Sequence, residues 1–493
     1  MSGTIDGSSR SLAKNAISQI GGRLFLSLGR LVAALMIVHV AGPDRFGEYA
    51  LVLQFIVLFE WLADFGQTDI GVRDICQRPA DEPVLLGALA TLKLVQGGIL
   101  ALLLPLLLLA MQYPASIVRA GAVGGVSVVC YALVQVFRAV FRVRMCTERD
   151  IAAELGGLAI MLPLTWFACR SGAGIETLVA CYSVARLVFL ALVIVFSRDE
   201  GQRAPRVIGR RAAMGLLLQA LPLGIAGLLV SMYDSLATIM LSKLTELQSV
   251  AQYAAATRFV FPVIIVVQAL GSAFYPPLSA AWRKSPGEFR RLQQSALDLS
   301  MLVGAGLFSG VFAGAGFLMG LMGPSIATAT PILRVMSVVV LARAVTTVMS
   351  PLIVVAGRQG KALWLTALSI LLQAAMLLLL VPRYGILGAA IGYLLIELVV
   401  GVVPVSVIGQ IVTGVRLRWA VSARLAACAM VAAGLCALLP LEGTIWSGIM
   451  GGLLYVGLAL ATGTVSIRQM RSVLTEVMTA RRARMAISSG DSA

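Results

Sequence analysis

Long apolar segments of about 20 residues, separated by short polar breaks, run through almost the whole chain. A helix of that length and composition can span the hydrocarbon core of a bilayer. Apolar residues make up 59% of the 493 residues, and charged residues make up only 13%. A soluble domain would carry about 25% charged residues. The sequence therefore predicts an all-α polytopic membrane protein.

The breaks between the apolar segments contain glycine, proline and charged residues, which commonly end helices. Taking each segment as one span predicts about 14 transmembrane helices. Their expected ranges are 14–41, 46–66, 84–112, 115–143, 150–170, 175–197, 213–241, 248–277, 294–322, 331–356, 361–381, 386–412, 422–440 and 445–466.

The predicted spans fall into two sets of six, followed by two more. The polar segment 197–211 follows the sixth span, and the twelfth span ends near Thr413. The sequence GEYA at 47–50 and the sequence AQYA at 251–254 open the second and eighth spans, which favours two equivalent halves around a central cavity. The expected parts are a six-helix lobe at 1–205, a second six-helix lobe at 206–413, two additional helices at 414–466, and a basic amphipathic tail at 467–493.

The 39 lysine and arginine residues are distributed unevenly between the two sets of loops. One set holds only Arg45, Arg119, Arg170, Lys243, Arg334 and Arg383. Arg23, Arg30, Lys93, Arg186, Arg258 and Arg343 lie within predicted spans, and the others lie in the opposite loops and near the two termini. Because cytoplasmic loops are enriched in Lys and Arg, both termini are expected in the cytoplasm.

The first predicted span carries a stripe of polar residues along one face. Asn15, Gln19, Arg23, Ser27 and Arg30 fall within an arc of roughly 120° on a helix. A charge near the bilayer centre costs about 2.5–3.5 kcal/mol on insertion scales. Two arginines on one stripe therefore predict a hydrated or ion-paired interior surface, which suits the binding of an anion.

Charged residues in later spans have an ion-pairing interpretation beside a functional one. Glu60 and Asp64 share a face at spacing i and i+4, and Glu60 is placed at a depth where it could pair with Arg23. Asp234 in the seventh span and Arg258 in the eighth lie at similar depths, so they either pair with each other or contact a substrate.

The tenth span repeats the polar pattern with Arg343 and the hydroxyl residues that follow it. Lys93, Arg186 and Glu397 lie near the middle of other spans, where each is either paired or extends toward the interface. The candidates for ion pairing or for coupling to protons or cations are Glu60, Asp64, Asp234 and Glu397.

No catalytic constellation or cofactor motif is present. The seven cysteines lack metal-ligand spacing, and apolar packing is a better interpretation of Cys169 and Cys181 than a disulfide. No GxxxxGK[ST] phosphate loop occurs, and the expected outer loops are too short for an enzyme domain. The basic residues lie in short loops, which disfavours nucleic acid as a partner. We therefore expect no metal, no cofactor and no enzymatic activity.

Five segments carry a family resemblance: AGPDRFGEYA at 41–50, WLADFG at 61–66, MGPSIATATPILRVM at 322–336, VAGRQGKALWLTAL at 355–368 and LVPRYGILGAAIGYLLIE at 380–397. In this order they resemble the polysaccharide flippases, which belong to the multidrug, oligosaccharidyl-lipid and polysaccharide exporter (MOP) superfamily. The resemblance extends over most of residues 12–410. It implies two six-helix lobes around a central cavity.

The resemblance also implies a function. Such a protein would move undecaprenyl-pyrophosphate-linked oligosaccharide units from the inner to the outer leaflet of a bacterial cytoplasmic (inner) membrane by alternating access. The units would serve the assembly of O-antigen, capsule or exopolysaccharide, with membrane lipid and a polysaccharide polymerase or other assembly proteins as partners. Arg23, Arg30 and Arg258 fit cavity arginines that face the pyrophosphate. Arg343, Asn15 and Gln19 are further candidates on polar stripes.

Other functions remain open at this point. A related exporter of the same fold would carry a peptidoglycan precursor or exchange drugs. A drug antiporter handles mostly cations, however, and should line its cavity with acids. A membrane enzyme of glycan assembly would need a larger loop than any expected here. A structural scaffold would not account for the polar stripes.

Overall fold

The computed structural model describes residues 21–198, 210–282, 285–355, 357–414, 418–439 and 443–464. These residues are almost entirely helical, and no strand occurs among them. The predicted tail at 467–493 and the candidate residues Asn15 and Gln19 lie outside the described residues.

The described helices follow one another through short turns. The opening helix, Gly21–Ala41, ends in the π-helical turn η1 (Ile37–Ala41). The elements after it are α2 (Pro43–Asp64), α3 (Gln67–Gln77), η2 (Pro79–Asp81), α4 (Glu82–Ala110), α5 (Ala115–Val143), α6 (Thr147–Arg170), α7 (Ile175–Arg198), α8 (Arg210–Leu244), α9 (Leu247–Ala281), α10 (Pro286–Ala313), α11 (Ala315–Gly320), α12 (Pro324–Ala327), α13 (Thr330–Val355), α14 (Gln359–Ile396), η3 (Glu397–Val402), α15 (Val403–Thr413), α16 (Trp419–Leu438) and α17 (Ile445–Ala461).

Within the described part of the chain, 12 helices are long and apolar enough to cross a membrane. One of them, Gly360–Thr413, consists of two helices that meet at Gly385, where φ is 58°. The apolar helix α17 is shorter, at 17 residues. The prediction of an all-α, multi-pass membrane protein is confirmed, and the count of 14 spans stays a prediction.

One helix was not expected from the apolar pattern. α3 follows α2 after a break at Phe65 and Gly66, whose φ values are 43° and 70°. The sequence of α3, QTDIGVRDICQ, is too polar to be read as part of a span. Hydropathy alone therefore placed the end of the second span correctly and missed the short helix beyond it.

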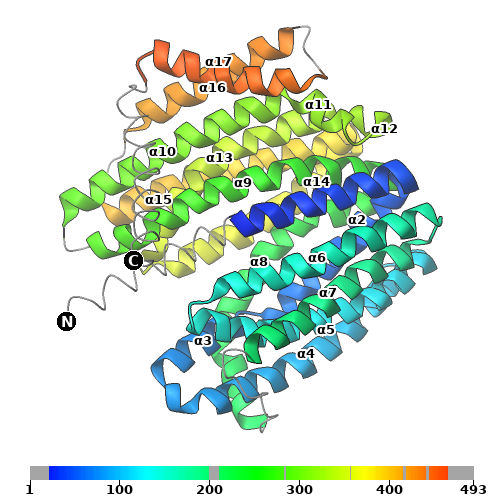
Figure 1. The fold of residues 1–493 in the computed structure, drawn as a ribbon. Coiled ribbons are helices and arrows are strands. Elements are labelled where there is room, and N and C mark those ends of the chain that lie inside the picture. The colour runs from blue at the N-terminus through cyan, green and yellow to red at the C-terminus, as the bar shows by residue number, and fades with distance from the viewer. Residues whose placement is uncertain are drawn as a thin grey trace, which may run out of the picture.

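The helices pack as two groups joined through α2 and α8. We call the opening helix with α2–α7 the first bundle, and α8–α15 the second bundle. α2 packs against α4, α5 and α7 of the first bundle and against α8 and α9 of the second. In Figure 1 the opening helix runs between α9 and α6, and α16 and α17 lie at one edge, where they pack chiefly on α10. The domain boundaries at 205 and 413 stay a prediction.

The two bundles are in contact where the opening helix turns into α2, which we call the Gly42 end. A Cβ atom at Gly47 of α2 would overlap the carbonyl oxygen of Leu247 in α9, so the two backbones touch. Nearby, the hydroxyl oxygens of Tyr113 and Ser242 lie 2.6 Å apart. One apolar core contains buried residues of both bundles. The Gly42 end is therefore closed by direct packing.

This close approach predicts that Gly47→Ala destabilises the protein. The added methyl group would push α2 from α9, because a backbone carbonyl cannot rotate away as a side chain can. Overpacking of this kind costs typically 1–3 kcal/mol, which is about the size of effect expected. The thermal midpoint of the purified protein in detergent measures it. Gly98→Ala is the matched control, since a Cβ there meets nothing within 4 Å. An equal midpoint for both variants would contradict the prediction.

Candidate functional site

The first bundle holds a buried ion pair between α2 and α7. Arg186 donates from Nε and Nη2 to the two carboxylate oxygens of Glu60 at 3.1 and 2.8 Å. The Tyr182 hydroxyl donates to the same carboxylate at 3.2 Å. The guanidinium of Arg186 also lies 5.0 Å from the ring centroid of Tyr131. The side chains of Arg186 and Glu60 are only 9% and 4% exposed, so this two-point contact neutralises both charges away from water.

Lys93 caps the end of α2. Its buried ammonium donates to Asp64 Oδ1 at 2.8 Å and to the carbonyl oxygens of Ala63 and Asp64 at 2.9 and 2.7 Å. The last carbonyls of a helix lack partners within it, and α2 ends at Asp64, before Phe65 adopts a left-handed conformation. Lys93 and Asp64 therefore have a structural role that explains their charges.

The second bundle contains a matching cluster on α8, α13, α14 and η3. Arg343 Nε lies 3.3 Å from Glu397 Oε1, and Arg343 Nη2 donates to the Tyr393 hydroxyl at 3.0 Å. The Tyr233 hydroxyl donates to Glu397 Oε2 at 3.2 Å. Arg343, one of the predicted anion-binding residues, is therefore already engaged by a carboxylate.

Neither ion pair considered in the sequence analysis is formed among the described residues. Glu60 pairs with Arg186 rather than with Arg23. Asp234 and Arg258 make no ion pair with each other. The expected depth of each charge along its helix suggested these pairs, but depth does not determine which helices are neighbours.

Asp234 lies beside the charge cluster of the second bundle. Its side chain is exposed and makes no hydrogen bond or ion pair with the described residues. It is within electrostatic range of Arg343 and Glu397. Glu60, Asp64 and Glu397 are all paired, so Asp234 differs from the other three predicted acids.

The two arginines of the opening helix are both exposed. Arg23 has no hydrogen-bonding or ionic partner among the described residues. Arg30 donates to Glu154 Oε1 of α6 at 2.9 Å, yet 47% of its side chain remains exposed. Hydrocarbon does not solvate a guanidinium, so exposure at this depth indicates a hydrated space. The predicted polar stripe is thus accessible where the structure describes it.

The structure brings Arg30 near Arg258 of the second bundle. Arg258 is half-buried in α9 and has no ionic partner in the described chain. It lies about 16 Å along α9 from Leu247, and Arg30 lies about 18 Å from Gly42, so both are near mid-span. The two guanidinium groups are within electrostatic range of each other. Two like charges from different bundles, with one carboxylate partner for Arg30 and none for Arg258 among the described residues, form a candidate anion site.

Three charged residues near this site were missed by the sequence analysis. Glu154 of α6 contacts Arg30, and it also lies 3.6 Å from Arg186 and 3.8 Å from Arg138 of α5. Arg138 in turn donates to Asp150 at 2.8 Å. Glu154 and Asp150 stand at spacing i and i+4 near the start of α6, where acids are common at helix N-termini, so the sequence carried only a weak signal for them.

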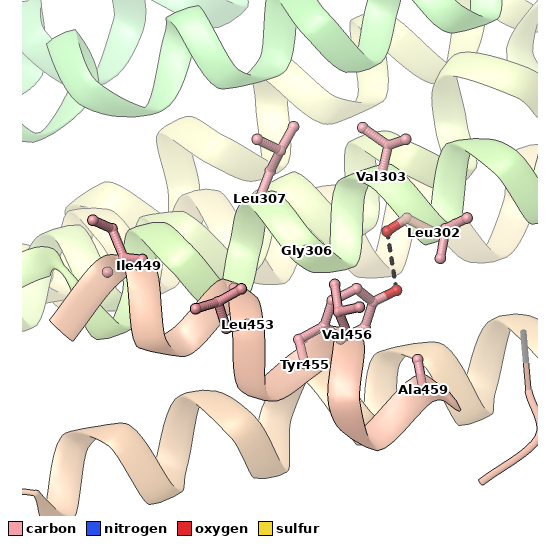
Figure 2. A pocket seen from close by; sticks show the side chains of 11 residues that line it. Leu302, Val303, Gly306, Leu307, Ile449, Leu453, Tyr455, Val456 and Ala459 are labelled. Atoms are coloured by element: carbon pink, nitrogen blue, oxygen red, sulfur yellow. Dashed lines mark hydrogen bonds between the residues drawn. The ribbon is translucent and has the colours of Figure 1, made fainter. Parts of the chain in front are cut away.

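A cavity lies away from these charges, between α10 and α17. Figure 2 shows this groove of about 490 Å³, with Leu302, Val303 and Leu307 on one side and Ile449 and Leu453 on the other. The groove is almost wholly apolar, and the Tyr455 hydroxyl is already donated to the Leu302 carbonyl at 3.0 Å. Such a groove has no means of holding an anion, so the candidate site remains the one at Arg30 and Arg258.

Comparison with known proteins gives a family match and a shared fold. The sequence matches the family described as polysaccharide biosynthesis protein over residues 12–282. No curated protein matches the sequence. Among solved structures, the chain is similar to the lipid II flippase MurJ in an inward closed conformation, with a TM-score of 0.71 and 10% identity. That similarity covers 89% of this chain and 97% of the other.

Two further structures share the fold. An inward-facing multidrug resistance MATE family transporter of the MOP superfamily has a TM-score of 0.65 and 15% identity, over 79% of this chain and 94% of that one. A MOP superfamily transporter from Pyrococcus furiosus, described as having a binding pocket of reverse polarity, has a TM-score of 0.61 and 16% identity, over 82% and 95%. The prediction of the MOP fold is confirmed.

The buried pair of the first bundle gives a stability prediction. Arg186→Met should lower the free energy of unfolding by about 3–5 kcal/mol, because it leaves the Glu60 carboxylate buried without its main partner. The double variant Arg186→Met with Glu60→Leu should recover most of that loss, since apolar packing replaces the pair. Denaturation of the purified protein in detergent measures both.

Arg119→Ala is the control for this measurement. Arg119 also pairs with an acid, Glu176, but its side chain is 66% exposed, and exposed pairs contribute about 0–1 kcal/mol. An Arg186→Met variant no less stable than Arg119→Ala would show that the buried pair has no structural role.

Proposed function

The chain belongs to the polysaccharide biosynthesis protein family, and we propose that it is a flippase for undecaprenyl-pyrophosphate-linked oligosaccharide units. It would move these units from the inner to the outer leaflet of the bacterial cytoplasmic membrane by alternating access. The units would then enter the assembly of a surface polysaccharide, such as O-antigen, capsule or exopolysaccharide.

The observation that carries the proposal is that Arg30 and Arg258, from two different bundles, are within electrostatic range of each other and of Tyr49. Arg30 has one carboxylate partner and Arg258 has no ionic partner among the described residues. Their mutual repulsion is relieved when an anion lies between them. A guanidinium keeps its charge at all relevant pH values and donates two parallel hydrogen bonds to phosphate. The chemistry therefore suits a pyrophosphate that links the bundles.

The balance of unpaired charges supports an anionic substrate over the cationic drugs of an antiporter. Glu60, Asp64 and Glu397 are neutralised by Arg186, Lys93 and Arg343 respectively. Of the four candidate acids only Asp234 has no ionic partner among the described residues, while Arg23, Arg258 and half-exposed Arg30 offer positive charge. A peptidoglycan-precursor flippase would need similar chemistry, and the family match favours the polysaccharide unit.

Charge distribution and packing together suggest the direction of access. The loops poor in Lys and Arg adjoin the Gly42 end, and this distribution supports an outer position for that end. The bundles pack closely there, and the exposed Arg23 lies toward the opposite end. At that opposite end α8 also contacts the first bundle, where Arg73 donates to Gln219 at 2.7 Å and Phe65 meets Gly224. The headgroup would therefore enter from the cytoplasmic leaflet on the side of the opening helix and not beside α8. An anion moving outward would gain about 2.3 kcal/mol per charge per 100 mV.

Replacing either arginine should abolish export of surface glycan. Arg30→Ala and Arg258→Ala each remove a charge-assisted contact, worth about 1.5–3 kcal/mol, from the pyrophosphate. The expected result is a loss of surface polysaccharide with normal protein levels in the membrane. Arg30→Lys should restore part of the activity, because lysine keeps the charge and loses the paired donors. Glycan display by cells that depend on the variant measures the effect.

Arg119→Ala is again the matched control, since it removes an arginine from the Gly42 end and lies outside the candidate site. Normal glycan display by the double variant Arg30→Ala, Arg258→Ala would refute the assignment of these residues to the substrate.

A further inference from the structure

Glu154 lies among three arginines from three helices. Its Oε1 atom is 2.9 Å from Arg30 Nη2 and 3.6 Å from Arg186 Nη1, and its Oε2 atom is 3.8 Å from Arg138 Nη2. Only Arg30 makes a contact of normal hydrogen-bond length. Glu154 is thus the point at which the candidate anion site joins the buried charge network of the first bundle.

The three arginines differ in how much they depend on Glu154. Arg186 has its own carboxylate in Glu60 at 2.8 Å, and Arg138 has its own in Asp150 at 2.8 Å. Arg30 has no other carboxylate partner among the described residues. If Arg30 moved away, Glu154 would still lie next to two positive charges. Arg30 can therefore move away from Glu154 while that carboxylate keeps two positively charged neighbours. Without them, a carboxylate left unpaired in the interior would destabilise the protein.

Local packing fixes the position of Glu154 relative to the opening helix. A Cβ at Gly22 would overlap the side chain of Ile151, and a Cβ at Gly29 would overlap that of Leu158. Ile151 and Leu158 lie one turn before and one turn after Glu154 on α6. The two glycines let the opening helix approach α6 closely before and after Glu154. The distance between the helix axes is set by this packing, so Arg30 changes partner by rotating its side chain.

We propose that Glu154 is an internal counter-ion for Arg30. It pairs with Arg30 when no substrate is bound, and Arg30 breaks this pair to bind the pyrophosphate when the substrate arrives. This inference rests on the proposed function and adds a positioning residue to it. In the empty state Glu154 orients Arg30 and neutralises part of its charge. In the loaded state Arg186 and Arg138 hold Glu154, and Arg30 faces the phosphate. Glu154 then competes with the substrate and promotes its release on the far side.

The advantage of such competition follows from the needs of transport. A site must bind its substrate strongly enough to admit it and weakly enough to release it. Two arginines and a pyrophosphate form strong charge-assisted hydrogen bonds. A carboxylate that competes for Arg30 lowers the affinity of the site, because binding of the phosphate then requires the Arg30–Glu154 contact to break.

The substitution Glu154→Gln tests the proposal, because it removes the charge and keeps the shape and a carbonyl oxygen that accepts from Arg30. Binding of farnesyl pyrophosphate, a short prenyl pyrophosphate, to the full-length protein in nanodiscs should become at least roughly fivefold tighter, in the range of typical coupling between sites. Export of glycan in cells should slow, since release becomes harder. Tighter binding with slower export distinguishes a counter-ion from a residue that only supports the fold.

Asp150→Asn is the matched control, because it removes one carboxylate from the same helix, four residues earlier, next to Arg138 and not Arg30. It should leave the affinity for farnesyl pyrophosphate near that of the native protein. Adding Arg30→Ala to Glu154→Gln should abolish the gain in affinity. Unchanged or weaker binding by Glu154→Gln, or an equal gain in Asp150→Asn, would overturn the proposal.

The single variant Arg30→Ala separates this proposal from the proposed function. If Arg30→Ala weakens binding of farnesyl pyrophosphate and Glu154→Gln does not strengthen it, the counter-ion role fails and the anion site stands. If Arg30→Ala binds farnesyl pyrophosphate as the native protein does, the anion site itself fails. Thermal midpoints of all variants show whether a change in binding reflects a loss of folding.

Discussion

The two-point contact between Arg186 and Glu60 is the interaction on which the interior of the first bundle depends. It joins α2 to α7 in a place where an unpaired charge would be very costly. Lys93 with Asp64, and Arg343 with Glu397, satisfy the same requirement elsewhere. The helices are therefore held together by charges that cancel. Arg23 and Arg258 lack such a partner among the described residues, and Arg30 remains partly exposed beside its one partner, which is why we propose these arginines for the anion site.

The fold class could be predicted from the sequence, because an apolar segment of about 20 residues is long enough to cross a membrane as a helix. The exposed arginine stripe of the opening helix was also readable, since periodicity places residues on one face of their own helix. The ion-pair partners of the charged residues could not be predicted in the same way. Glu60 finds its partner 126 residues later on α7, and Arg30 finds Glu154 on α6. Neither contact has any signature within a single segment, because helix adjacency is a property of the assembled bundle.

Two local features were missed for different physical reasons. α3 is too polar to register as a span, although the left-handed Phe65 and Gly66 before it mark a sharp change of direction. Glu154 follows closely on Glu148 and Asp150 of the first turn of α6, so in the sequence it resembles a continuation of an acidic helix start. Because an acid near the start of a helix is already explained by its position, the identity of Glu154 gives no sequence signal for a role in charge pairing. Only its three arginine neighbours reveal one.

The last two described helices, α16 and α17, lie on the outer side of the second bundle. α16 and α17 pack chiefly on α10, close enough that Gly310 and Gly314 meet Gly448 backbone to backbone, and Ser309 donates to the Gly451 carbonyl at 2.8 Å. They touch neither the arginines nor the contact between the bundles. A fluorophore on α17 would therefore travel as a rigid reporter of the second bundle. Paired with a label on α4, it would report any movement of the second bundle relative to the first that the proposed alternating access requires.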